Sequence, residues 1–216
     1  MSEPRVTAKD IKPIDNRGYV PTLRADFVVL GMLSDYLGRI PYEGSLVERF
    51  YPAERKAVVL FLRYLTASGA AATADALTSG HIEVHSPQAK RRLDAFYEIE
   101  PQMFCPALRL REGVFPTMTR RQYDASEVDP RFSYLYGVYL RYGLSEPFGY
   151  RLANSVQRVE LIKSFLADLD AEWVSHKYTL RTAPTCNELT FEPDFVLGTL
   201  LNKALSERIG CQEFDG

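Results

Sequence analysis

The segment that decides the predicted fold is Leu135-Tyr136-Gly137-Val138-Tyr139-Leu140-Arg141-Tyr142-Gly143. It lies in a predicted helix over residues 131–142, which is followed by a break at 143–149 and a strand over 150–154. A long helix over 156–172, strands over 173–181 and 188–191, and a last helix over 194–208 come next. This mixture of helices and short strands predicts an α+β protein.

The part of the chain before this segment repeats much of the same order. We expect helices over 23–37, 53–67, 69–78 and 87–99, and strands over 81–85, 107–111 and 114–123. The run from Leu60 to Tyr64 matches the run from Val138 to Tyr142 in residue type, and a strand ending in serine (Ser86, Ser155) precedes a helix in each part. We therefore predict two pseudo-repeated helix-strand-helix-strand halves, although helices with similar apolar stripes also look alike by chance.

The boundaries of these parts follow from proline, glycine and charge. Residues 1–22 are predicted to be an N-terminal arm, and residues 23–123 the first half. The acidic run 124–130 ends in proline and is predicted to be a linker. Residues 131–216 form the second half, with its C-terminal helix and a short tail.

The segment 135–143 resembles the motif helix of LAGLIDADG homing endonucleases, and Leu135, Gly137 and Gly143 agree with that consensus. The resemblance implies a helix that packs closely against its counterpart at a two-fold axis, as small residues allow. It also implies a saddle of antiparallel sheet backed by helices. The resemblance covers residues 131–209, and residues 53–123 by analogy. This part of the chain is particularly similar to the degenerate copy of the fold in a family of bacterial sporulation transcription factors, in which catalysis has been lost.

The resemblance also implies that this chain is not a nuclease. The metal-binding acid of the family falls on the residue before the final glycine, which is Tyr142, and its counterpart would be near Tyr64 or Leu65. A hydroxyl with a pKa near 10 cannot replace a carboxylate as a ligand for Mg²⁺ at pH 7. No catalytic residue, metal or cofactor is therefore expected. An alternative places the first motif helix at 29–38 with Asp35 as its acid, although its glycine spacing is off by one residue.

Alternation along the predicted strands gathers basic residues on one side. If these strands share one sheet, its outward face carries Arg109, Arg111, Arg151, Lys177 and Arg181, with Arg120 and Arg121 near the edge. Such a face suits binding to a phosphate backbone, and we expect these five residues to contact DNA or RNA. The alternative is that outward arginines and lysines discourage pairing of sheet edges.

The composition limits the classes of function and the cellular compartments that are expected for this chain. A net charge of -2 and a pI near 6.0 exclude a strongly basic nucleic-acid protein, so any such binding depends on local charge. The N-terminus lacks the apolar stretch of a signal peptide, and the longest apolar run is too short for a bilayer, so no membrane role is expected. The three cysteines, Cys105, Cys186 and Cys211, are widely separated, which favours a reducing compartment such as the cytoplasm.

Three functions follow from these patterns. The first is a non-catalytic nucleic-acid-binding protein that uses the basic sheet face. The second is a protein-interaction module, such as an inhibitor, immunity factor or structural subunit, with a partner bound through a tyrosine-rich surface. Tyr134, Tyr136, Tyr139 and Tyr142 all lie in one helix, which could equally be packed between the halves. The third is a divergent metal-dependent endonuclease that uses Glu146 or Asp35.

Overall fold

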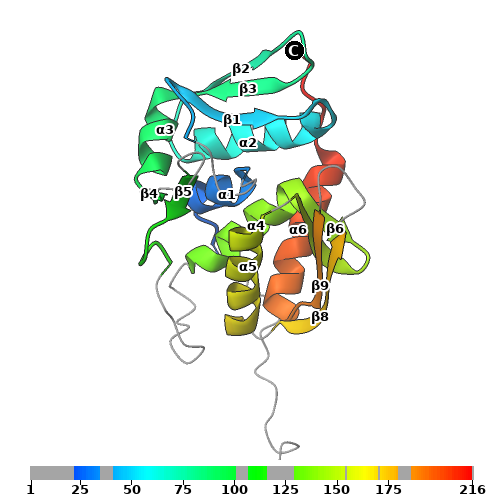
Figure 1. Ribbon diagram of the computed structural model, residues 1–216. Coiled ribbons are helices and arrows are strands. Elements are labelled where there is room, and N and C mark those ends of the chain that lie inside the picture. Colours follow the sequence, from blue (N-terminus) through cyan, green and yellow to red (C-terminus); the bar gives the residue numbers. More distant parts are fainter. Residues whose placement is uncertain are drawn as a thin grey trace, which may run out of the picture.

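The computed structural model describes residues 22–34, 41–100, 107–115, 129–153, 155–169, 171–179 and 186–215. This part of the chain has a mixed α+β fold with six α-helices and three antiparallel sheets. Figure 1 shows helices α1 (Ala25–Met32) and α4 (Pro130–Tyr142) at the centre, with a three-stranded sheet above them and a four-stranded sheet at the lower right.

Helices α1 and α4 are in contact through their backbones. A Cβ atom added at Gly31 would lie 2.2 Å from the carbonyl oxygen of Tyr134, and one added at Gly137 would lie 2.0 Å from that of Val28. Both distances are far below any real contact of a Cβ atom, so glycine is required at both positions. The close approach predicted for the 131–142 helix is therefore present, and its partner is α1.

The three-stranded sheet lies between these central helices and solvent. The chain runs through β1 (Leu46–Phe50), the short 3-10 helix η1 (Pro52–Glu54), α2 (Arg55–Ala67), β2 (Thr73–Ala76), β3 (Ile82–His85) and α3 (Pro87–Asp94). Strands β2 and β3 form a hairpin, and β1 pairs with β3, which gives the order β1-β3-β2. Helix α2 runs along the side of this sheet that faces α1 (Figure 1).

The four-stranded sheet has a related order. Its chain runs through β6 (Gly143–Ser145), β7 (Phe148–Ala153), α5 (Val156–Asp168), β8 (Glu172–Thr179), β9 (Cys186–Glu192) and α6 (Phe195–Gly210). Strands β8 and β9 form a hairpin, and β7 pairs with β9, which gives the order β6-β7-β9-β8. A separate two-stranded sheet of β4 (Tyr97–Glu100) and β5 (Ala107–Leu110) lies between the two parts in sequence.

Both ends of α4 are fixed by side chains. The carboxylate of Asp129 accepts a hydrogen bond from the backbone N–H of Arg131 at 2.8 Å and so caps the first turn. The Arg131 side chain is 1% exposed and pairs with Asp129 and, across to α5, with Asp168. At the other end, Arg208 of α6 donates to the carbonyl oxygen of Gly143 at 2.8 Å, where a cation is favourable next to the last turn.

The tyrosines of α4 belong to the core. Tyr134, Tyr136 and Tyr139 are at most 2% exposed and contact aromatic rings from α2, α5 and β7. The packed-helix interpretation is therefore confirmed for these three residues, and a partner surface made of them is wrong. Their side chains are already buried by this chain's own elements.

Most of the predicted helices and strands are present, and the errors have local causes. The predicted helix over 69–78 is wrong: Gly69 has a φ of +78°, which ends α2, and the next residues pair with β3 as strand β2. The predicted helix over 87–99 ends at Asp94, because Tyr97–Glu100 pairs with β5. The predicted break at 143–149 is the β6–β7 hairpin.

Other boundaries shift or lie outside the described residues. The helix predicted over 23–37 covers Ala25–Met32, and the long helix predicted to reach residue 172 ends at Asp168. Of the strand predicted over 114–123, Val114 and Phe115 are irregular, and the rest lies outside the described residues. Residues 1–21 of the predicted arm and 124–128 of the predicted linker also lie outside them.

Replacing Gly137 by alanine is expected to lower the free energy of unfolding by roughly 3 kcal/mol or more, because the new Cβ atom meets a backbone carbonyl that cannot rotate away. The matched control is Gly210→Ala in the last turn of α6, where an added Cβ atom meets nothing within 4 Å. That change should leave stability within about 1 kcal/mol of the wild type. Urea denaturation measures both, and equal effects would contradict the backbone contact.

Candidate nucleic-acid interface

Arg141 lies in the last turn of α4 and is held by acceptors from other elements. Its side chain is 1% exposed, and Nε and Nη2 donate to the two carboxylate oxygens of Glu54 at 2.8 and 2.9 Å. Nη1 donates to the carbonyl oxygen of Met32 at 2.8 Å, and the guanidinium lies 4.2 Å from the centre of the Phe50 ring. A planar, bidentate and ring-stacked cation of this kind requires arginine rather than lysine.

Glu48 is a second carboxylate beside this guanidinium, and it is completely buried on β1. One of its oxygens lies 3.6 Å from Nη1 of Arg141. The carboxylate also accepts hydrogen bonds from the backbone N–H and the hydroxyl of Ser34, at 2.8 and 2.7 Å. Burial by itself lowers the pKa of Arg141, but the neighbouring phenol and the two carboxylates raise it more, so the guanidinium stays charged. Arg141, Glu48 and Glu54 form what we name the central ion cluster.

Tyr142, which the sequence resemblance aligns with the metal-binding acid of LAGLIDADG enzymes, lies next to this cluster. Burial raises the pKa of Tyr142 to about 12, against the lowering effect of Arg141, so the phenol is neutral at pH 7. Its hydroxyl lies 3.5 Å from the carbonyl oxygen of Leu33. A neutral phenol beside a fixed guanidinium does not fit a hard divalent cation. Among the described residues, no three His, Cys, Asp or Glu side chains are grouped so as to hold a metal ion.

The endonuclease alternative uses two acids, Glu146 and Asp35. Glu146 is exposed in the turn between β6 and β7, and Asp35 lies outside the described residues.

The outward face of the four-stranded sheet carries Arg151 and Lys177, on strands β7 and β8. Arg151 is exposed, while its neighbours Tyr150 and Leu152 point into the core. The register places Glu188 of the central strand β9 directly between Arg151 and Lys177, and Arg151 pairs with it at 2.9 Å. The prediction that the outward face gathers basic residues with almost no acid is therefore wrong in this row.

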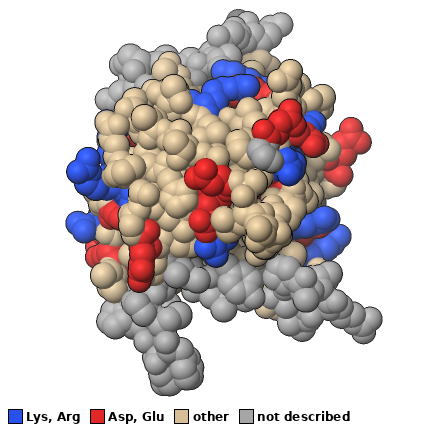
Figure 2. All heavy atoms as spheres, turned by 90° about the horizontal axis from the view of Figure 1, so that it is seen from above, with Lys and Arg blue, Asp and Glu red and all other residues tan. Residues whose placement is uncertain are grey.

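The three-stranded sheet has a similar row. Arg49 of β1 pairs with Glu83 of the central strand β3, and Asp75 of β2 lies opposite Glu83 in the register. Figure 2 looks down on this end of the molecule, and its coloured acidic and basic side chains are interspersed, without a basic patch. Two carboxylates and one guanidinium make this row acidic, so it is unsuited to a phosphate backbone.

The remaining predicted contacts are on other elements. Arg109 and Arg111 belong to β5 and the segment after it, so the assumption of one shared sheet is wrong: β5 pairs with β4 and not with β7 or β8. Arg111 donates through Nε to the carbonyl oxygen of Tyr97 at 2.7 Å. Arg181, Arg120 and Arg121 lie outside the described residues. Of the five predicted phosphate contacts, Arg151 and Lys177 are brought together.

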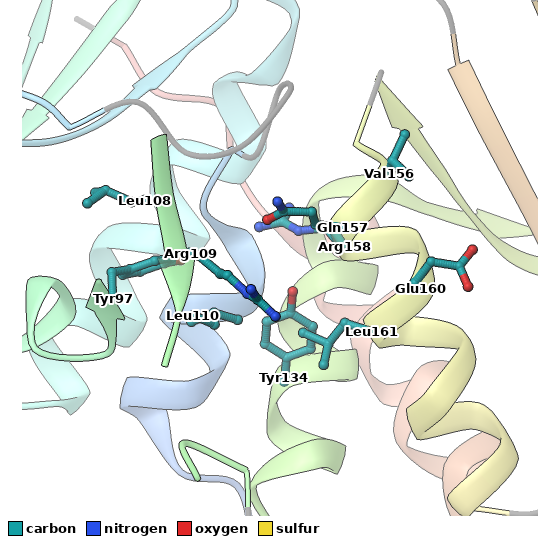
Figure 3. A pocket seen from close by; sticks show the side chains of 10 residues that line it. All are labelled: Tyr97, Leu108, Arg109, Leu110, Tyr134, Val156, Gln157, Arg158, Glu160 and Leu161. Atoms are coloured by element: carbon teal, nitrogen blue, oxygen red, sulfur yellow. The ribbon is translucent and has the colours of Figure 1, made fainter. Parts of the chain in front are cut away.

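Arg109 instead lines a cavity between β5 and α5, together with Arg158 (Figure 3). Sequence reasoning missed Arg158, which is 4% exposed and lies on the buried side of α5 with Val159 and Ile162. An arginine among the inward positions of an amphipathic helix is the signal that could have revealed it.

Comparison with known proteins adds no family. No protein-family model matches the chain, and no curated protein matches it significantly. Within the described residues, no helix is long and apolar enough to cross a membrane.

Replacing Arg141 by methionine is expected to cost about 3–5 kcal/mol of unfolding free energy, because the buried Glu48 and the partly exposed Glu54 lose their cation. The matched control is Arg151→Met, which breaks an exposed pair and should cost at most about 1 kcal/mol. Chemical denaturation at neutral pH measures both. Equal losses would show that the central ion cluster is not electrostatically important.

Tyr142 is expected to make stability fall as the pH rises above 10. Its pKa is 10.0 when exposed and about 12 in the folded protein, so the folded state keeps a proton that the unfolded state loses. Its contribution is complete below pH 10 and decreases by up to about 1.4 kcal/mol per pH unit until pH 12. In urea denaturation at a series of pH values, Tyr142→Phe should show a shallower decline than the wild type. Tyr51→Phe, at a site 61% exposed, should keep the wild-type slope.

Proposed function

We propose that the two parts of this chain are copies of one α-β-α-β-β-α unit, arranged as a LAGLIDADG-like saddle, and that the protein binds nucleic acid without cleaving it. The observation that carries the proposal is the backbone contact of α1 and α4 at Gly31 and Gly137. Each of these helices precedes a sheet in which the second strand of a hairpin is central. In this alignment the first motif helix is α1, which includes residues 29–32 of the alternative motif at 29–38, rather than the helix predicted over 53–67.

The sheet faces support the same alignment. Arg49 and Glu83 pair between β1 and β3, and Arg151 and Glu188 pair between β7 and β9. If β1 corresponds to β7 and β3 to β9, the two ion pairs occupy equivalent places on their sheets. The third strands differ, with Asp75 on β2 and Lys177 on β8.

This difference favours the four-stranded sheet as the surface for nucleic-acid contact. Arg151 and Lys177 flank one carboxylate there and give the row a net positive charge. Exposed ion pairs contribute little free energy, so a phosphate can replace Glu188 as the partner of Arg151 at small cost. Arginine also presents two parallel donors to a phosphate. Nucleic acid would thus bind through the two cations of this row, Arg151 and Lys177. Its affinity would depend strongly on the salt concentration.

The centre of the molecule supports binding without cleavage at one of the two acid positions. In the proposed alignment Tyr142 takes the place of one metal-binding acid, while the other position is Asp35, which lies outside the described residues. The described carboxylates beside Tyr142, Glu48 and Glu54, pair with Arg141. These carboxylates would have to leave a buried guanidinium before they could bind a metal ion.

Substituting both Arg151 and Lys177 by glutamine is expected to weaken binding to DNA or RNA and to reduce the slope of log affinity against log salt by about 2. Fluorescence anisotropy with mixed duplex DNA and with RNA at two salt concentrations measures this. The control is Lys203→Gln combined with Arg91→Gln, which removes two exposed cations from α6 and α3. Glu188→Gln should have the opposite effect and strengthen binding, because it removes the competing carboxylate.

Three results would overturn the proposal. Absence of binding at low salt, or equal effects of the sheet and control variants, would favour the protein-interaction module. Metal-dependent nicking that is lost in Glu146→Gln or Asp35→Asn would favour the divergent endonuclease.

A further inference from the structure

Strands β2 and β8 each have an outer edge that pairs with no other strand among the described residues. Strand β2 comes last in the order β1-β3-β2, and β8 comes last in the order β6-β7-β9-β8. Figure 1 shows β2 at the top of the molecule, with β3 and β1 below it. Thr73, Asp75 and residues 176–179 are exposed. Each edge therefore offers its outward backbone N–H and C=O groups to a further strand.

The two edges carry opposite charges. Asp75 is the charged residue of β2, and Lys177 is the lysine in the exposed part of β8. In each sheet, the carboxylate that lies opposite this residue on the central strand pairs with an arginine of the strand beyond it. The side chains of Asp75 and Lys177 make no ion pair or hydrogen bond within the part of the chain that the structure describes. One edge is therefore acidic, the other is basic, and the two are complementary.

The neighbouring side chains of the two strands also match. In an antiparallel pair with Asp75 opposite Lys177 of a second copy, Thr73 lies opposite Thr179 on the same face. On the other face Ala74 lies opposite Tyr178, which is 50% exposed in the single chain. Opposite charges and threonine pairs stabilise neighbouring strands, and the small alanine leaves room for the tyrosine ring.

Pairing each strand with its own equivalent is less favourable. Aligning the exposed parts of two β8 strands, with their outward faces on one side, places two Lys177 side chains directly or diagonally opposite each other. The same alignment of two β2 strands does so for Asp75. Like charges that face each other across a strand pair destabilise it. The complementary partner of β2 is therefore β8, and Figure 1 places these strands at opposite ends of the molecule, so the partner strand belongs to another copy.

We propose that copies of this chain associate head to tail, with β2 of one copy added to β8 of the next as an antiparallel strand. The three-stranded sheet of one copy and the four-stranded sheet of the next then form one continuous sheet. Such an interface uses different surfaces of the two copies, so it generates a closed ring or an open chain of copies. Lys177 is a phosphate contact in the function proposed above, so a second copy and nucleic acid would compete for it.

Sedimentation equilibrium of the full chain, without nucleic acid, tests the proposal. Strand β2 contributes four residues, so the interface is small and the expected dissociation constant is roughly 0.1–1 mM at low salt. The weight-average mass of the wild type should therefore rise above 24.6 kDa as the concentration approaches about 1 mM. A mass that stays at 24.6 kDa would overturn the proposal. Because no nucleic acid is present, this result is independent of the proposed function.

Charge reversal decides whether these two edges form the interface. Asp75→Lys alone and Lys177→Glu alone should each weaken association by about tenfold or more, because each places like charges opposite each other. An equimolar mixture of the two variants should associate again, since each chain then finds an edge of opposite charge on the other. Association of either single variant at wild-type strength, or failure of the mixture to recover association, overturns the proposal.

The matched controls are Glu112→Lys, in the turn after β5, and Lys203→Glu on α6, which change the net charge by the same amounts at exposed positions. Both should associate as strongly as the wild type. Circular dichroism checks that all of these variants keep the fold, as expected for exposed side chains. If the controls lose association as well, the net charge rather than the two edges governs it, and the proposal is overturned.

Discussion

The arrangement of this protein depends on one close contact, the crossing of α1 and α4 at Gly31 and Gly137. At this crossing the backbone of each helix fills the space where the other would carry a side chain. The contact fixes how far apart the helix axes lie, and each helix leads into its own sheet. The large side chains of α4 then fill the wider gaps on either side, where Tyr136 meets α2 and Tyr139 meets β7. The glycines let the two helices approach closely, and the tyrosines fill the space that remains around the crossing.

The central ion cluster secures the same interface by electrostatics. Arg141 belongs to α4, whereas its acceptors come from α1, β1 and η1, all in the part of the chain before residue 100. Because Arg141 and Glu48 are buried, removing the guanidinium leaves the Glu48 carboxylate without its cation. Arg141 therefore has a structural role between the two parts of the chain. The neutral phenol of Tyr142 is compatible with that role, since a further negative charge would upset the balance of one cation and two carboxylates.

The fold could be predicted from sequence where a local signal was strong. The positions of prolines and caps, together with the apolar periodicity, predicted α2, α4, α5 and α6 with nearly the bounds that they have in the structure. The glycine spacing of residues 135–143 correctly predicted a close helix contact, but the partner could not be chosen by spacing alone. Gly31 and Gly38 are one residue too far apart for the consensus, yet Gly31 by itself is sufficient for the crossing. The alanine-rich strand β2 was missed because its pairing with β3, and not its own propensity, determines its conformation.

The candidate site shows why charge cannot be assigned strand by strand. The alternation of side chains along a strand correctly predicted that Arg151 points outward. It also predicted the face of β8 on which Lys177 lies. It could not show that Glu188, on a strand that lies between them in space but last in sequence, completes the row. Nor could it separate Arg109 from these residues, because strands that are similar in sequence can belong to different sheets. The effective charge of a sheet face depends on register, a long-range property, and here register converts a stripe of cations into an alternation of cation, carboxylate and cation. Any phosphate that binds there must compete with Glu188, so that carboxylate limits affinity as much as the two cations promote it.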